Sequence, residues 1–110
     1  MFAVIYKWKL NPGISPKAWE ENWHNGTALI HQKHGSIGAT LHKTEDGNYI
    51  SYARWHKKQD WETMMQDKSP EKQKFNNDHF VTRLEEPILL ELVDDQLHPL
   101  PWKTPSQSQN

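Results

Sequence analysis

The side chains of this 110-residue chain that could do chemistry are mainly histidines and aromatics, because cysteine is absent. Histidine exchanges a proton near neutral pH, so it is the natural general base. Of the seven histidines, His24 and His79 fall on predicted helical stretches beside aromatic residues, and these two are the candidate catalytic bases. The absence of cysteine excludes thiol nucleophiles, disulfides and cysteine-ligated metal sites.

Six tryptophans, three tyrosines and three phenylalanines supply the material for an aromatic-lined cavity. Large rings suit the walls of a site for a flat, apolar ligand. An arginine facing such a cavity could hold a phenolate or carboxylate through two parallel hydrogen bonds. The same aromatic residues would also serve as core or interface, and an arginine as the partner of a surface acid. The candidate ligand-binding residues are Tyr6, Trp23, Tyr52 and Arg54.

Three histidines in and near the first predicted helix, His24, His31 and His34, do not have the spacing of a metal site. His31 and His34 are three residues apart, whereas paired histidine ligands on a helix are usually four apart. No carboxylate stands where it would complete the set. The sequence therefore predicts no metal centre, and it also lacks a glycine-rich phosphate loop and a Ser-His-Asp set.

The length and composition describe one small domain. A net charge of -1 lacks the basic excess that is typical of nucleic-acid-binding proteins. No apolar run approaches the ~18 residues of a membrane span. Lys7 and Lys9 interrupt the N-terminal apolar stretch that a signal peptide would need. These features predict a cytoplasmic protein with no nucleic-acid or membrane partner.

The elements that must position these residues can be read from local patterns. Alternating apolar residues over 2–10 predict a strand, and an Asn-Pro-Gly break follows it. A Ser-Pro pair predicts the start of a helix over 16–33, and Gly35 suits its end. Strand patterns over 37–43 and 48–56 flank an Asp-Gly pair, which is a strong hairpin signal.

The second half of the chain repeats this order. Helical patterns cover 57–66 and 70–83, a Glu-Glu-Pro break follows, and the apolar run over 88–93 predicts a buried strand. The resulting β-α-β-β-α-β order is the ferredoxin-like, or split βαβ, arrangement. The predicted fold is therefore α+β, with a four-stranded antiparallel sheet and helices on one face.

The end of the chain differs in composition, being rich in Pro, Ser, Gln and Asn. This change predicts a domain over residues 1–94 and an extended tail over 95–110. Leu97, Leu100 and Trp102 are the residues of the tail that could dock on a partner protomer.

Both faces of the first predicted strand carry apolar side chains. Phe2, Val4, Tyr6, Trp8 and Leu10 share one face, and Ala3 and Ile5 lie on the other. If helices cover the first face, water would meet an apolar patch on the second, and such patches mark interfaces. A second copy of the sheet would cover it, which predicts a homodimer with a barrel-like core.

Several short motifs, taken in order, resemble the antibiotic biosynthesis monooxygenase domain. They are Lys9-Leu10-Asn11-Pro12-Gly13, Gly35-Ser36-Ile37-Gly38, and Tyr52-Ala53-Arg54-Trp55 followed by Trp61-Glu62. The resemblance covers residues 2–94 and implies the dimeric α+β barrel fold. It also implies a pocket between sheet and helices and, as in some members, oxygenation of an aromatic or quinol-type substrate without metal or organic cofactor.

The resemblance assigns roles to particular residues. Trp61 matches the helix tryptophan that lines the pocket in several members, where an indole can orient or stack on a substrate. Alternatively, Trp61 is the large buried residue of an amphipathic helix. Cofactor-free oxygenation needs a group that helps form the substrate anion, and His79 and His24 are the candidates.

Two other functions remain open. One is a non-catalytic module that binds a small aromatic molecule in the same pocket. The other is the haem-degrading branch, which uses an asparagine on the first strand and an axial histidine after the helix tryptophan. Lys7 and Lys9 occupy that strand, and Glu71 stands where the histidine would be needed. Haem chemistry is therefore disfavoured.

Overall fold

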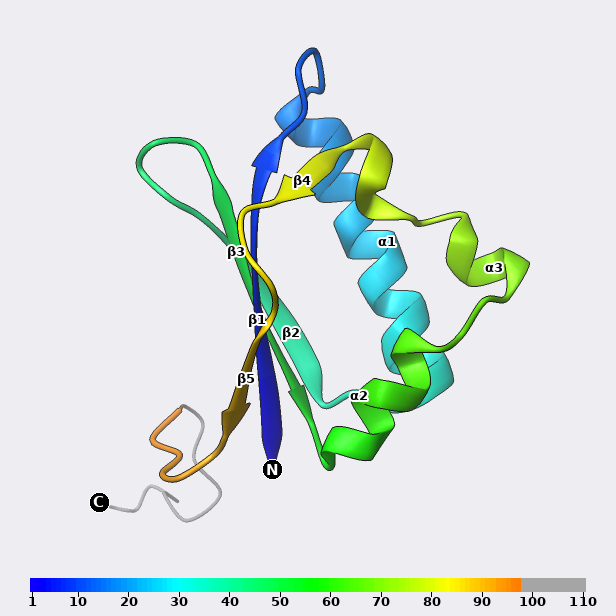
Figure 1. The fold of residues 1–110 in the computed structure, drawn as a ribbon, viewed down its shortest axis with the longest axis vertical. Helices are drawn as coiled ribbons and strands as arrows, with labels where there is room; N and C mark the ends of the chain where they lie inside the picture. Colours follow the sequence, from blue (N-terminus) through cyan, green and yellow to red (C-terminus); the bar gives the residue numbers. More distant parts are fainter. Residues whose placement is uncertain (98–110) are drawn as a thin grey trace, which may run out of the picture.

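Antiparallel strands form a single sheet, and the helices lie on one side of it (Figure 1). This computed structural model describes residues 1–97, so the predicted docking residues Leu100 and Trp102 lie outside the described residues. None of the helices within 1–97 is long and apolar enough to cross a membrane. The elements are β1 (Phe2–Leu10), α1 (Pro16–His34), β2 (Gly38–Lys43), β3 (Tyr49–Trp55), α2 (Lys58–Met65), α3 (Pro70–Gln73), the 3₁₀ turn η1 (Asn77–His79), β4 (Val81–Arg83) and β5 (Ile88–Glu91).

The sheet has the ferredoxin-like order β2-β3-β1-β4, as predicted. Both β4 and β5 pair with β1, β4 along residues 8–10 and β5 along residues 2–5. They therefore share one position in the sheet, as a single strand that is interrupted over residues 84–87. Proline has no N–H for a sheet hydrogen bond, which fits its place in the interruption.

The predicted boundaries of α1 are close to the observed ones because local capping signals set them. The Ser15 hydroxyl accepts a hydrogen bond of 3.1 Å from the Ala18 N–H, and Pro16 opens the helix. At the other end Gly35 takes the left-handed conformation, with φ +70°, and its N–H bonds to the His31 carbonyl.

The helix predicted over 70–83 is wrong beyond Gln73. The Asn11 side chain donates to the carbonyls of Asp78 and His79, and the Asn11 N–H bonds to the Phe80 carbonyl at 2.9 Å. These bonds come from a residue far away in the sequence, and they draw the segment into η1 and then β4. Long-range pairing has thus overridden local helical preference.

The core lies between the sheet and α1. Trp19, fully buried on α1, meets Trp8 and Tyr49 from the sheet, while Val4, Trp55 and Met64 form a second cluster. Even-numbered β1 residues therefore face the helices. An added Cβ at Gly26 would stand 2.9 Å from the Phe75 Cβ, so a glycine is needed where α1 meets the loop after α3.

The opposite side of the sheet, here called the open face, is apolar at its centre. Ile5 lies beside Tyr52 on β3 and beside Ile88 on β5. Ile50 and Leu90 complete the patch, and all five side chains are partly exposed. The described helices all lie on the other side (Figure 1).

The start of the predicted tail contacts the open face. The Asp95 carboxylate forms an ion pair of 2.7 Å with the Arg54 guanidinium. The Leu92 N–H also bonds to the Met1 carbonyl at 2.9 Å, which extends the β5–β1 pairing by a residue. The chain therefore remains attached to the sheet beyond β5.

Candidate active site

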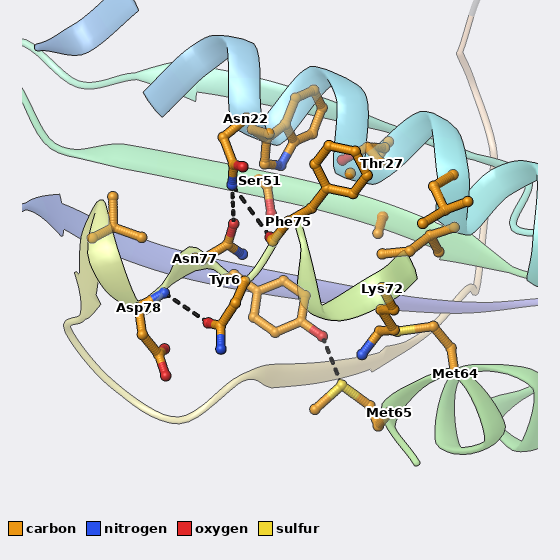
Figure 2. A pocket seen from close by; sticks show the side chains of 18 of the residues that line it. Tyr6, Asn22, Thr27, Ser51, Met64, Met65, Lys72, Phe75, Asn77 and Asp78 are labelled. Atoms are coloured by element: carbon orange, nitrogen blue, oxygen red, sulfur yellow. Dashed lines mark hydrogen bonds between the residues drawn. The ribbon is translucent and has the colours of Figure 1, made fainter. Parts of the chain in front are cut away.

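A cavity of about 530 Å³ lies between α1, the sheet and the segment that follows α2 (Figure 2). This volume is within the range that is typical of sites for small ligands. Tyr6, Trp8 and Trp55 from the sheet contribute aromatic wall, as do Trp23 from α1 and Phe75 from the loop after α3. The cavity is thus suited to a flat molecule.

The Tyr6 hydroxyl is the most precisely positioned polar group of the cavity. It accepts a hydrogen bond of 2.8 Å from the Trp61 indole N–H and lies 3.7 Å from the Met65 sulfur, to which it donates. The Tyr6 ring stacks on Trp8, with centroids 5.4 Å apart and planes 6° from parallel. Two directional contacts and one stacked ring therefore hold the phenol in a single orientation.

The environment keeps that phenol protonated. Burial raises the pKa of Tyr6 above its ordinary value, although the Trp61 hydrogen bond and the charge of Arg83 act in the opposite direction. The thioether of Met65 is a weak acceptor. A substrate oxygen could therefore replace the sulfur as the acceptor of the Tyr6 proton.

Asparagines join α1 to the segment that closes the cavity. The Asn22 amide donates to the Asn77 side-chain oxygen and to the Phe75 carbonyl, both at 3.2 Å. Figure 2 shows Asn22 reaching from α1 to these two partners. This clamp holds the loop after α3 against the helix and so sets the shape of the cavity.

The cavity lining includes three cationic side chains, together with the carboxylates of Asp67 and Asp78. The cationic side chains are those of Lys68, Lys72 and Arg83. Lys72 is partly buried, and within residues 1–97 it has no ion-pair or side-chain hydrogen-bond partner. Burial lowers the pKa of Lys72, the charge of Asp67 acts against this, and the charges of Lys68 and Lys33 act in the same direction as burial. An anionic ligand group would relieve this unpaired charge.

The carboxylate nearest to these lysines is already engaged. Asp67 lines the cavity, but its Oδ2 lies 2.8 Å from His34 Nε2 and 3.0 Å from the Lys33 ammonium. Its Oδ1 accepts the Ser69 N–H at 2.8 Å. These contacts tie the loop between α2 and α3 to the end of α1, and they leave Lys72 free for a ligand.

Comparison with known proteins identifies the fold. No protein-family model and no curated protein sequence matches the chain. Among solved structures, SnoaB, a cofactor-independent oxygenase from Streptomyces nogalater, matches with TM-score 0.72 and 14% identity over 86% of this chain and 95% of SnoaB. HapK from Hahella chejuensis matches with TM-score 0.72 and 13% identity over 88% and 97% of the two chains.

A protein from Chloroflexus aurantiacus, named as a candidate antibiotic biosynthesis monooxygenase, matches with TM-score 0.68 and 13% identity over 86% and 94% of the chains. This chain has the antibiotic biosynthesis monooxygenase fold. The predicted resemblance is confirmed at that level. These neighbours share the protomer architecture with the chain, and its own chemistry depends on its own cavity.

Within this fold, the predicted ligand-binding residues divide between the two sides of the sheet. Tyr6 and Trp23 line the cavity. Trp61 is not one of the lining residues and acts on the cavity only through its hydrogen bond to Tyr6. Tyr52 and Arg54 instead lie on the open face, because side chains alternate along a strand and Ser51, Ala53 and Trp55 point inward.

Neither predicted histidine lies in the cavity of this monooxygenase fold. His24 is exposed on α1, and His79 is exposed in η1 with its ring edge-on to Phe80 at 4.9 Å. Sequence reasoning missed Lys72 and Arg83. Arg83 is the other arginine of the chain, and only the pairing of β4 with β1 places it beside Trp8.

The Asp67 contacts make stability depend on pH in a defined direction. The hydrogen bond from His34, followed by the Ser69 N–H and the Lys33 ammonium, holds the pKa of Asp67 well below its ordinary value. The contribution of the Asp67 carboxylate to the free energy of unfolding is therefore complete above the unfolded carboxyl pKa of ~4. It is lost as the pH falls toward the lowered pKa of the folded state.

We expect Asp67→Asn to lower the melting temperature at pH 6. The difference in melting temperature between this variant and wild type should narrow steadily as the pH falls from 5 to 2. Thermal unfolding followed by circular dichroism measures both. Exposed Glu86, which precedes β5, offers a control as Glu86→Gln, since this replacement leaves the Asp67 cluster intact. A gap for Asp67→Asn that stays constant over this pH range would contradict the assignment.

Proposed function

We propose that this protein is a cofactor-independent oxygenase of an aromatic or quinol-type substrate. The observation that carries the proposal is the Tyr6 hydroxyl, protonated and oriented by Trp61 inside an aromatic-walled cavity. The charge of Lys72, which lines the same cavity, suits a substrate that must become an anion. The fold shared with SnoaB, a cofactor-independent oxygenase, supports the same function.

The residues would act by stabilising the substrate anion. A phenol or hydroquinone bound between the rings loses a proton to water, because neither candidate histidine lines the cavity, and the resulting oxyanion accepts the Tyr6 hydrogen bond. Lys72 and Arg83 offset its negative charge. The electron-rich anion then reacts with O₂. For a methylene carbon of an anthrone-like ring, the balance is CH₂ + O₂ → C=O + H₂O.

Oxygen uptake tests this function directly. The purified chain is incubated with a panel of hydroquinones and anthrone-like phenols, without added metal or flavin, and uptake is followed with an oxygen electrode. We expect uptake with at least one member above the rate without protein. Tight binding of a member with no uptake across the panel would instead favour the alternative, a non-catalytic module that binds an aromatic molecule.

Lys72 offers a second test of the same site. Replacing it with methionine keeps an unbranched side chain that is one heavy atom shorter and removes the charge. We expect Lys72→Met to weaken binding of the phenolate form by ~10-fold or more, as for the loss of about one charged hydrogen bond. Binding of a neutral analogue of the same shape should change little. Lys74, exposed nearby, gives the matched control as Lys74→Met.

The open face supports a proposal about assembly. Its patch of Ile5, Ile50, Tyr52, Ile88 and Leu90 would meet water in a monomer, and contiguous apolar patches of this kind are typical of interfaces. The occupant is a second copy of the chain, with the two sheets packed face to face. An obligate interface of this type would bury ~2,000 Å² or more in total.

A further inference from the structure

We propose that Trp8, Trp19 and Tyr49 form a relay that carries a one-electron oxidation from the cavity to a proton-accepting surface carboxylate, Glu20. The proposal extends the proposed function, because O₂ chemistry on an organic anion passes through radical species. The relay would remove an oxidising equivalent that escapes the substrate and would protect the cavity from damage.

The three rings are in continuous contact. Trp8 lines the cavity, and its ring centroid lies 5.1 Å from that of Trp19, at 71°. Trp19 lies 6.0 Å from Tyr49, at 73°. Trp19 is fully buried, and Trp8 and Tyr49 are 5% and 2% exposed. Tryptophan and tyrosine are among the most easily oxidised side chains, and electrons tunnel rapidly between rings in contact.

The middle of the relay cannot retain the oxidation as a neutral radical. A tryptophan radical cation is trapped when its indole N–H gives up the proton to a base. The Trp19 Nε1 atom is buried and has no hydrogen-bond partner among the described residues. The oxidation therefore stays mobile at Trp19 and passes to a residue that can release a proton.

Tyr49 is that residue. Its hydroxyl donates to the Glu20 Oε2 atom at 2.6 Å, and the Glu20 side chain is 46% exposed. Burial, together with Glu20, raises the pKa of Tyr49 to about 12, so the resting phenol keeps its proton. Oxidation makes a phenol strongly acidic, and the existing hydrogen bond then delivers its proton to the Glu20 carboxylate.

The electrons and protons of the relay balance. A peroxyl radical in the cavity takes one electron from Trp8 and one proton from water and becomes a hydroperoxide. Trp19 reduces the Trp8 radical cation, and Tyr49 reduces that of Trp19 while its proton moves to Glu20. A water-soluble thiolate then returns one electron to the Tyr49 radical and becomes a thiyl radical, and Glu20 returns the proton. Without the relay, cavity residues such as Met65 would be oxidised to sulfoxide.

The absence of cysteine allows the oxidant to be placed at one position. Met65 lines the cavity and is 40% exposed, so Met65→Cys can carry a ruthenium polypyridyl photo-oxidant in the full chain. After flash excitation with a soluble quencher, we expect a tyrosyl radical in the transient absorption and freeze-quenched EPR spectra. Adding Tyr49→Phe should remove this signal and leave a tryptophan radical, and Trp19→Phe should also remove it.

Two further variants of the same labelled protein test whether the loss of signal comes from disturbed packing of the rings. Glu20→Gln changes an exposed side chain and leaves the three rings in place, and it should slow formation of the tyrosyl radical. Tyr52→Phe, on the open face, should leave the signal unchanged. A tyrosyl signal that survives Tyr49→Phe, or that forms equally fast in Glu20→Gln, would overturn the relay. Because no substrate is present, the result is independent of whether the protein consumes oxygen.

Discussion

Replacing Tyr6 with phenylalanine should lower the turnover number for the aromatic substrate by ~10²–10³-fold, as for loss of one preorganised oxyanion donor. The change removes a hydroxyl that accepts from Trp61 and points toward Met65, but it keeps the ring that stacks on Trp8. Because the ring contacts remain, substrate affinity should fall much less than turnover. Oxygen-uptake kinetics with the best substrate of the panel separate the two quantities.

Two variants serve as controls for this prediction. Tyr52→Phe also removes one tyrosine hydroxyl, but from the open face, and should leave turnover unchanged. Trp61→Phe removes the indole N–H that orients Tyr6, so a smaller loss of turnover should accompany it. Full turnover in Tyr6→Phe, with the fold intact by circular dichroism, would show that Tyr6 only packs.

Ile5→Glu should convert the proposed dimer into monomers, because it places a carboxylate at the centre of the open face between Tyr52 and Ile88. Losing a central interface residue costs ~2 kcal/mol or more, and burying an unpaired charge adds to this. A loss of ~2 kcal/mol raises the dissociation constant by about thirtyfold. Sedimentation velocity over a dilution series measures the shift.

Gln32→Glu provides the matched change of charge, since Gln32 is exposed on α1, away from the open face. Its sedimentation should match that of wild type at every concentration. A wild-type chain that is a stable monomer at micromolar concentration would contradict the assembly, as would an Ile5→Glu chain that remains dimeric.

Local sequence signals were sufficient for the first two-thirds of the fold. The alternation over residues 2–10, the Ser15 cap and Gly35 act within a few residues of where they stand, so β1 and α1 follow from their own segments. The Asp-Gly hairpin likewise brings β2 and β3 together. Local signals were not sufficient for the region after α2. There the hydrogen bonds of Asn11 and β1 to residues 78–83 join segments that are far apart in the sequence.

The residues of the candidate site also divide into those that local patterns predict and those that depend on the tertiary structure. Tyr6 and Trp23 could be found because each belongs to an apolar set with the period of its own element. Tyr52 and Arg54 were assigned to the site although the alternation of β3 puts them on the opposite side from Trp55, and only the pairing with β1 makes that side the open face. A shift of one residue in a strand exchanges its two faces.

The sequence by itself determined the elements up to α2 and the α+β fold class, because periodicity, caps and turns are properties of short segments. Only the tertiary structure decided which polar groups share the cavity. Lys72 comes from α3 and Arg83 from β4, while Tyr6 and its partner Trp61 are separated by 55 residues. Their meeting depends on the docking of the loop after α2 against α1 and β1. That docking is a sum of long-range contacts, which no local pattern encodes.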